Sequence, residues 1–245
     1  MRRQLVLSAT ALAAVLAITS PAAAHSNRDD ATVVCNGSAT GLTINGDVSV
    51  PAGGACRLTD STVRGDVKAS NGAYFQASGT TIRGDVKGRR AQTLFIEGGS
   101  SVRGDLVGDR TSQVFVFGSG IWGRIDVQRA DDKVNVCGNT VRGDIVVEQS
   151  GRDILIGDPL ALDCPGNVVK RGDIEIEDNF VDVELVIRGN TISRGDLDVK
   201  RNDGPADKFV QNNAGGGKLN CRSNDTPFTA SANTGWDRIA GQCKP

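Results

Sequence analysis

Residues 62–68 read TVRGDVK, and close variants of this stretch return along most of the chain. The glycines at their centres follow one another at intervals of 19, 19, 20, 19, 20, 29 and 23 residues. A period of about 20 residues indicates a solenoid, in which each period forms one coil. The two longer intervals predict loop insertions near residues 157–168 and 178–190. The glycines are Gly46, Gly65, Gly84, Gly104, Gly123, Gly143, Gly172 and Gly195.

Apolar and polar residues alternate within the quoted stretch, so that Val63, Gly65 and Val67 share one face. A period of two with β-branched residues is typical of a strand that buries one face. Two or three short strands per coil, separated by turns, predict an all-β, single-domain parallel β-helix. A second apolar pair precedes each motif: Phe75/Ala77, Leu94/Ile96, Val114/Val116, Val134/Val136 and Ile154/Ile156.

Coils of 19 to 20 residues that tolerate insertions resemble the right-handed, pectate-lyase-like β-helix family more than left-handed hexapeptide helices. We therefore expect a right-handed helix. The apolar-x-Gly-Asp-apolar unit is also similar, more weakly, to the bactofilin-type repeat over residues 40–200. The ending from Asn220-Cys221 to Gly241-Gln242-Cys243 resembles that of secreted actinobacterial β-helix proteins. These resemblances imply a secreted bacterial protein.

The first 24 residues have the pattern of a signal peptide. Arg2 and Arg3 precede an apolar run over 5–19, and small residues over 22–24 form a cleavage site. We expect a polar N-terminal segment at 25–31, the β-helix at 32–203, and a Gly-rich exit with a C-terminal cap at 204–245. This organisation predicts an extracellular protein without membrane insertion.

Six cysteines in an exported chain predict three disulfides. We favour sequential pairing, because two of the resulting separations are about one coil and would stack the partners on neighbouring turns. A zinc site is not expected, since the chain has no CxxC pair and only one histidine. The predicted pairs are Cys35–Cys56, Cys137–Cys164 and Cys221–Cys243.

The formal net charge of −1 becomes −3 without Arg2 and Arg3, which does not suit a general nucleic-acid binder. Stacking of the coils predicts two charged columns on the outer surface. We expect them to pair with each other, with Arg124 interrupting the second column. Arg-Gly-Asp would then sit inside strands, which does not suit cell adhesion. The columns are Arg64, Arg83, Arg103, Trp122, Arg142, Arg171 and Arg194, and Asp47, Asp66, Asp85, Asp105, Arg124, Asp144, Asp173 and Asp196.

Aromatic residues gather in the third to fifth coils, where Phe95, Phe115 and Phe117 fall near outward positions. Exposed aromatic side chains on a rigid sheet form a platform for sugar rings or for another protein. A register shifted by one residue would instead place them in the core, and the sequence leaves both alternatives open. With Trp122 and Arg124, these three residues form the predicted binding set.

No residue stands out as catalytic. His25 is the single histidine, so mechanisms that need a histidine base are not expected. Adjacent carboxylates in a strand, as at Asp131 and Asp132, point to opposite faces. We predict no catalytic residue, no metal site and no cofactor. The favoured hypothesis is a non-catalytic structural or binding protein that presents a charged face to cell-wall glycan or protein. The alternative is a β-helix carbohydrate-active enzyme resembling polysaccharide lyases.

Overall fold

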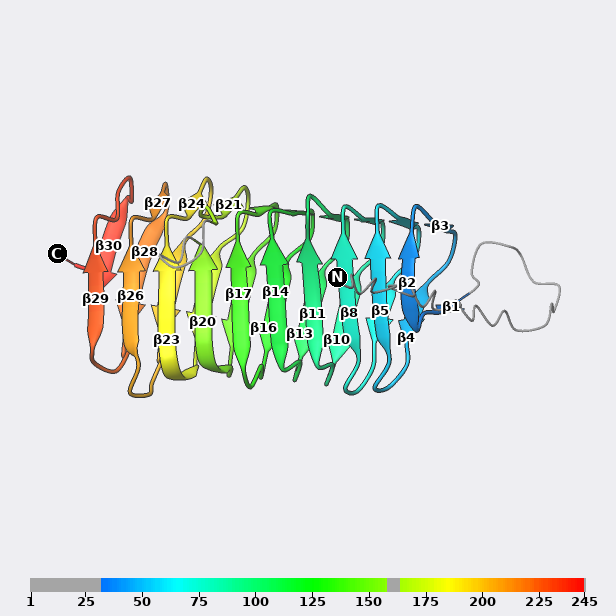
Figure 1. The fold of residues 1–245 in the computed structure, drawn as a ribbon. Coiled ribbons are helices and arrows are strands. Elements are labelled where there is room, and N and C mark those ends of the chain that lie inside the picture. Colours follow the sequence, from blue (N-terminus) through cyan, green and yellow to red (C-terminus); the bar gives the residue numbers. More distant parts are fainter. Residues whose placement is uncertain (1–31, 158–163, 245) are drawn as a thin grey trace, which may run out of the picture.

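The computed structural model describes residues 32–157 and 164–244, and the predicted signal peptide and polar N-terminal segment lie outside them. The described chain winds into a right-handed parallel β-helix of about ten turns, stacked along one axis from β1 to β30 (Figure 1). The predicted fold class is confirmed. In this described part, no helix is long and apolar enough to cross a membrane.

Three parallel sheets form the walls. Sheet A contains β1 (Val33–Val34), β4 (Val48–Val50), β7 (Val67–Ala69), β10 (Val86–Arg89), β13 (Leu106–Asp109), β16 (Ile125–Gln128), β19 (Ile145–Glu148), β22 (Ile174–Glu177), β25 (Leu197–Lys200), β28 (Lys218–Arg222) and β30 (Arg238–Gly241). Sheet B contains β2 (Gly37–Thr40), β5 (Ala55–Thr59), β8 (Tyr74–Ser78), β11 (Thr93–Glu97), β14 (Gln113–Phe117), β17 (Lys133–Cys137), β20 (Gly151–Gly157), β23 (Phe180–Arg188), β26 (Asp207–Gln211) and β29 (Phe228–Ser231). Sheet C contains β3 (Thr43–Ile44), β6 (Thr62–Val63), β9 (Thr81–Ile82), β12 (Ser101–Val102), β15 (Gly120–Ile121), β18 (Thr140–Val141), β21 (Val168–Val169), β24 (Thr191–Ile192) and β27 (Ala214–Gly215).

The turns run from a strand of sheet B through a two-residue strand of sheet C to a strand of sheet A, except that the last turn, from β29 to β30, has an isolated bridge at Thr234 in place of the sheet C strand. Equivalent residues stack in register, as in the file Val67, Val86 and Leu106. The inward side chains of all three sheets form one continuous apolar core, in which Phe75 and Leu94 are fully buried. A single coil cannot bury this face alone, so stacking supplies both the backbone hydrogen bonds and the core.

Lys208 is the exception among the inward residues of sheet B. It is fully buried and lies in register with Leu185. Its ammonium donates hydrogen bonds to the carbonyl oxygens of Gly204 at 2.8 Å and Ala206 at 3.0 Å. Burial lowers the pKa of this lysine, because desolvation penalises its charged form.

The two predicted insertions differ in kind. The first falls between Gly157 and Cys164, across residues that lie outside the description. The second was predicted as a loop, which is wrong. The chain over 180–188 forms the long strand β23, whose register with β20 shifts between Gly151 and Asp153. The extra residues of β23 are taken up at this shift in register, where Phe180 and Val183 are exposed.

The sheets also continue beyond residue 203. β26 to β30 add further strands to the same three walls, where the sequence suggested an exit and a cap. Asn213 and Asn224 continue the buried side-chain ladders described below, which explains why the winding persists.

The three disulfides pair as predicted: Cys35–Cys56, Cys137–Cys164 and Cys221–Cys243. The first and third tie neighbouring turns near the two ends of the described helix. The second fixes the far end of the first insertion to β17. Three disulfides are consistent with an extracellular protein.

Candidate anion-binding face

The Arg-Gly-Asp motif occupies the corner between sheets C and A. The sequence placed it inside a strand, which is wrong, because residues 64–66 lie between β6 and β7. At this corner the aspartate accepts a hydrogen bond from a backbone amide of the next turn. Asp47 Oδ1 accepts from Asp66 N at 2.8 Å, and Asp66 Oδ1 accepts from Asp85 N at 3.0 Å. The aspartates therefore form a ladder that joins successive corners.

The glycine of the motif follows from the same geometry. A Cβ at residue 65 would lie 2.7 Å from Asp47 N and 2.7 Å from the carbonyl carbon of Gly46. Such contacts are shorter than real side chains show, so the corners stack only when glycine stands there. Glycine and aspartate are thus architectural, and the recurrence of the tripeptide comes from the fold.

The second oxygen of the N-terminal aspartates faces lysines on sheet A. Lys68 Nζ lies 2.8 Å from Asp47 Oδ2, and Lys87 Nζ lies 2.6 Å from Asp85 Oδ2. The hydrogen bond from Lys68 lowers the pKa of Asp47, and the one from Lys87 lowers the pKa of Asp85. These carboxylates are therefore engaged on two sides without any arginine of the motif.

The arginines of the motif are exposed and make no ion pair with any carboxylate among residues 32–157 and 164–244. The predicted pairing between the Arg and Asp columns is therefore wrong. The aspartates turn toward backbone amides, and Asp47 and Asp85 also bind lysines, so the arginines beside them are left without ion pairs among the described residues. We call this file of side chains the arginine row: Arg64, Arg83, Arg103, Trp122, Arg142 and Lys170.

Trp122 stands within the arginine row between two guanidinium groups. Arg142 lies 3.9 Å from the indole centroid, and Arg103, on the other adjacent turn, lies 5.5 Å from it. Cation–π contacts orient both arginines and separate two like charges. Trp122 is 47% exposed, and guanidinium groups from both adjacent turns contact its ring.

The row changes at its C-terminal end, because one extra residue enters each corner. Three residues separate Val141 from Ile145, whereas four separate Val169 from Ile174. Lys170 takes the row position, as its amide donates to Val141 O at 2.9 Å. Arg171 and Arg194, which the sequence placed in the column, are the additional residues, and Lys170 and Ser193 occupy the equivalent positions.

The phenylalanines form a cluster on the outer face of sheet B. Phe95 lies 5.6 Å, centroid to centroid, from both Phe115 and Phe117, with edge-to-face geometry. They are half-buried, while their neighbours Leu94 and Val114 are fully buried, so the outward register is the one found.

The predicted binding set does not come together. The phenylalanines lie on sheet B and Trp122 follows sheet C. Arg124 lies at the corner leading to sheet A, where its guanidinium is 2.9 Å from Asp126 Oδ2. Arg124 also interrupts the aspartate ladder, as predicted, and its amide donates to Asp105 Oδ1 at 3.0 Å.

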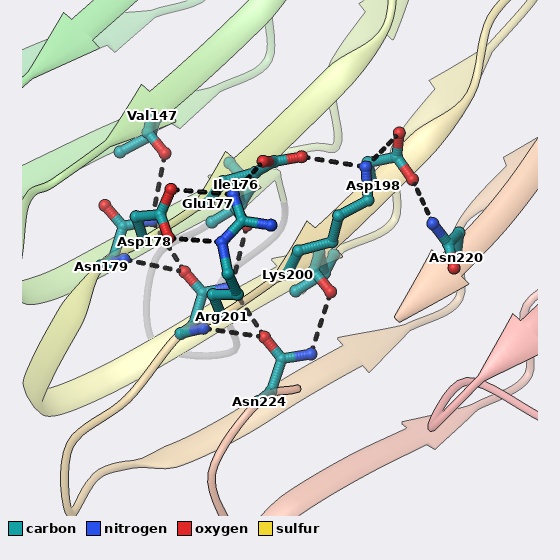
Figure 2. A network of polar contacts seen from close by, with 12 residues as sticks. Val147, Ile176, Glu177, Asp178, Asn179, Asp198, Lys200, Arg201, Asn220 and Asn224 are labelled. Atoms are coloured by element: carbon teal, nitrogen blue, oxygen red, sulfur yellow. Dashed lines mark hydrogen bonds and ion pairs between the residues drawn. The ribbon is translucent and has the colours of Figure 1, made fainter. Parts of the chain in front are cut away.

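Sequence reasoning missed two buried asparagine ladders at the other corners. Figure 2 shows the one between sheets A and B, in which Asn179 Nδ2 donates to Asn202 Oδ1 at 2.8 Å and to Val147 O at 3.0 Å. The signal was present, because these asparagines recur with the coil period. The ladder members are Asn179, Asn202 and Asn224 at this corner, and Asn139, Asn167, Asn190, Asn213 and Asn233 between sheets B and C.

Acidic side chains gather on sheet A. Burial, and then the nearby charge of Asp173, raises the pKa of Glu175. No group of three or more potential ligands in the described part of the chain is arranged to hold a metal ion.

Comparisons with protein-family models, with curated proteins and with solved structures each found no match.

Proposed function

We propose that this protein is a non-catalytic extracellular binding protein that holds acidic polysaccharide along the arginine row. The observation that carries this proposal is the row itself. It presents five cations over six successive turns, none with a carboxylate partner among the described residues, while Asp47 and Asp85 of the neighbouring column bind backbone amides and lysines.

The spacing of the row suits a linear polymer. Neighbouring turns of a β-helix lie about 4.8 Å apart, so Arg64, Arg83 and Arg103 offer one guanidinium per step. Like charges at this distance repel, and a bound polyanion relieves that repulsion. Guanidinium groups bind carboxylates through paired hydrogen bonds. A glycan with one negative charge per sugar is therefore a fitting ligand, and cell-wall polysaccharide is the proposed source.

Two further features support an extracellular glycan over nucleic acid. The three disulfides suit an oxidising compartment, in agreement with the signal peptide predicted at residues 1–24. Trp122 has its ring faces engaged by Arg103 and Arg142, so it is not free to stack on bases. The resemblance to pectate-lyase-like proteins concerns the winding and does not supply a catalytic centre.

The test is retention of the protein on polygalacturonate and on a neutral glucan at low and high salt. We expect binding to polygalacturonate alone, weakened by salt, and reduced at least about tenfold by Arg83→Ser with Arg103→Ser, since two charge-assisted contacts are lost. Arg89→Ser with Arg90→Asn is the matched control, because it removes two exposed charges at a different corner and Asn suits the φ of 55° at residue 90.

Equal loss in the control, or equal retention on the neutral glucan, would contradict the proposal. Release of unsaturated oligosaccharides from polygalacturonate, with or without calcium, would instead establish the alternative of a lyase-like enzyme.

A further inference from the structure

A pocket of about 420 Å³ opens at the C-terminal end of the arginine row. Four cationic side chains from three successive turns line it, together with two hydroxyl groups, and no acidic residue of the described part of the chain is among its lining residues. Its lining residues are Thr140, Arg142, Lys170, Arg171, Ser193 and Arg194.

The extra corner residues create this pocket. In the earlier turns each corner offers one row side chain, whereas here Lys170 is followed by Arg171, and Ser193 by Arg194, before the chain enters sheet A. Arg142 is held from the other side by its contact with Trp122 at 3.9 Å. The extra corner residues therefore concentrate positive charge at one place along the arginine row.

A second pocket, of about 450 Å³ on sheet A, shows how charges are arranged elsewhere. Its Lys200 lies 2.9 Å from Asp198 Oδ2, which also lines that pocket, and 3.0 Å from Glu177 Oε1. Among residues 32–157 and 164–244, the cations beside Thr140 and Ser193 have no such carboxylates. Several unpaired cations around one concavity suit an anion that carries more than one charge and several acceptor oxygens.

We propose that this pocket binds a tetrahedral oxyanion, a phosphate or sulfate ester carried by the polysaccharide. The identity of the polymer rests on the proposed function, whereas the site itself rests on its own residues. The arginines supply forked donors, Lys170 supplies a point charge, and Thr140 and Ser193 supply hydroxyl donors. The volume also leaves room for a sugar that bears the ester.

The experiment compares dextrans carrying carboxymethyl, sulfate or phosphate groups at matched charge density, so that the ligands differ only in the anion. We expect the protein to prefer sulfate or phosphate over carboxymethyl dextran by about tenfold or more. The ratio should fall toward one in Arg171→Ser with Arg194→Ser and persist in Arg89→Ser with Arg90→Asn. A phosphate ligand is further marked by a preference that weakens below about pH 6, where its second charge is lost, while a sulfate ligand keeps its preference.

Equal affinity for all three dextrans, or a ratio that survives in the Arg171 and Arg194 variant, would overturn this inference and leave the proposed function standing. Failure to bind any acidic dextran would overturn both. Tighter binding of a single-stranded oligonucleotide than of phosphorylated dextran would overturn the assignment to a glycan.

Discussion

At the scale of single residues, the Arg-Gly-Asp motif divides its tasks. Glycine allows the corners of neighbouring turns to approach, and aspartate joins them through a backbone amide. Arginine takes part in neither task and remains available at the surface. The motif therefore recurs because glycine and aspartate are needed for stacking. The arginine has no part in the stacking and is the residue that we propose binds ligand.

Gly104→Ala tests the close approach. A Cβ there would lie 2.8 Å from Gly84 O and would also meet Asp85 Oδ1, the acceptor for the amide of Asp105. We expect a loss of about 1–3 kcal/mol in the free energy of unfolding, measured by urea denaturation. Gly120→Ala is the control, because a Cβ there meets nothing within 4 Å and should change stability by less than about 0.5 kcal/mol. Equal effects would contradict this role for glycine.

Asn190→Ala tests the asparagine ladders. Asn190 Nδ2 donates to Ile156 O and Asn213 Oδ1, and its Oδ1 accepts from the amide and side chain of Asn167. Alanine would leave buried polar groups without partners, so we expect a loss of about 2–4 kcal/mol in the free energy of unfolding. Asn220→Ala removes one outer hydrogen bond to Asp198 and should cost less than about 1 kcal/mol. If Asn190→Ala lowered the free energy of unfolding no more than Asn220→Ala does, the asparagine ladder would not be needed for stability.

At the scale of elements, polar side chains join the corners of successive turns. Aspartates run between sheets C and A, and asparagines run along the other two corners in the C-terminal half. Toward the N-terminus, hydroxyl groups such as those of Ser61, Thr80 and Ser100 take the place of asparagine between sheets B and C. At the corners the backbone leaves the sheets, so its amide and carbonyl groups lose their partners in the strands. These side chains supply the hydrogen bonds that such buried backbone groups need.

The coil period predicted the fold and the inward residues, because stacked strands must repeat their apolar positions in register. The alternation could not separate strand from corner, since Val63, Gly65 and Val67 alternate across both. The Arg and Asp columns were expected to pair because they lie side by side, whereas Asp47 and Asp85 bind amides and lysines. The position of Arg171 was predicted wrongly, because the one extra residue between sheets C and A shows only in how the strands of neighbouring turns pair.

The aspartate corner also makes stability depend on pH. The folded-state pKa values of Asp47 and Asp85 lie below their usual range because Lys68 and Lys87 donate to them. Their contribution is fully present above the unfolded pKa of about 4 and is lost as pH falls through the lowered folded values. We expect the urea midpoint to fall as the pH drops below about 5, and to fall less in Lys68→Met with Lys87→Met.

Lys170→Met is the control for this pH dependence, because Lys170 makes no ion pair among the described residues and should leave the acid sensitivity as in the parent. The same acid sensitivity in the Lys68 and Lys87 variant would show that the stability lies elsewhere.

At the scale of the whole molecule, the winding of the repeat places cationic side chains in one row at a fixed spacing along the helix axis. From Arg64 to Lys170 the row crosses six strands of sheet C, a span of about 24 Å at the usual strand spacing. Disulfides tie neighbouring turns near both ends of the described helix. Because the scaffold fixes the cations, binding orders few protein side chains beyond the arginines, which favours affinity.

The most direct test of the account is the affinity of the protein for acidic oligogalacturonates of increasing length. If the arginine row binds the polymer along its length, affinity rises with each added sugar until the oligosaccharide spans Arg64 to Lys170, and then levels off. Arg83→Ser with Arg103→Ser should flatten the rise. An affinity that does not depend on length, or a rise unchanged in that variant, would contradict it.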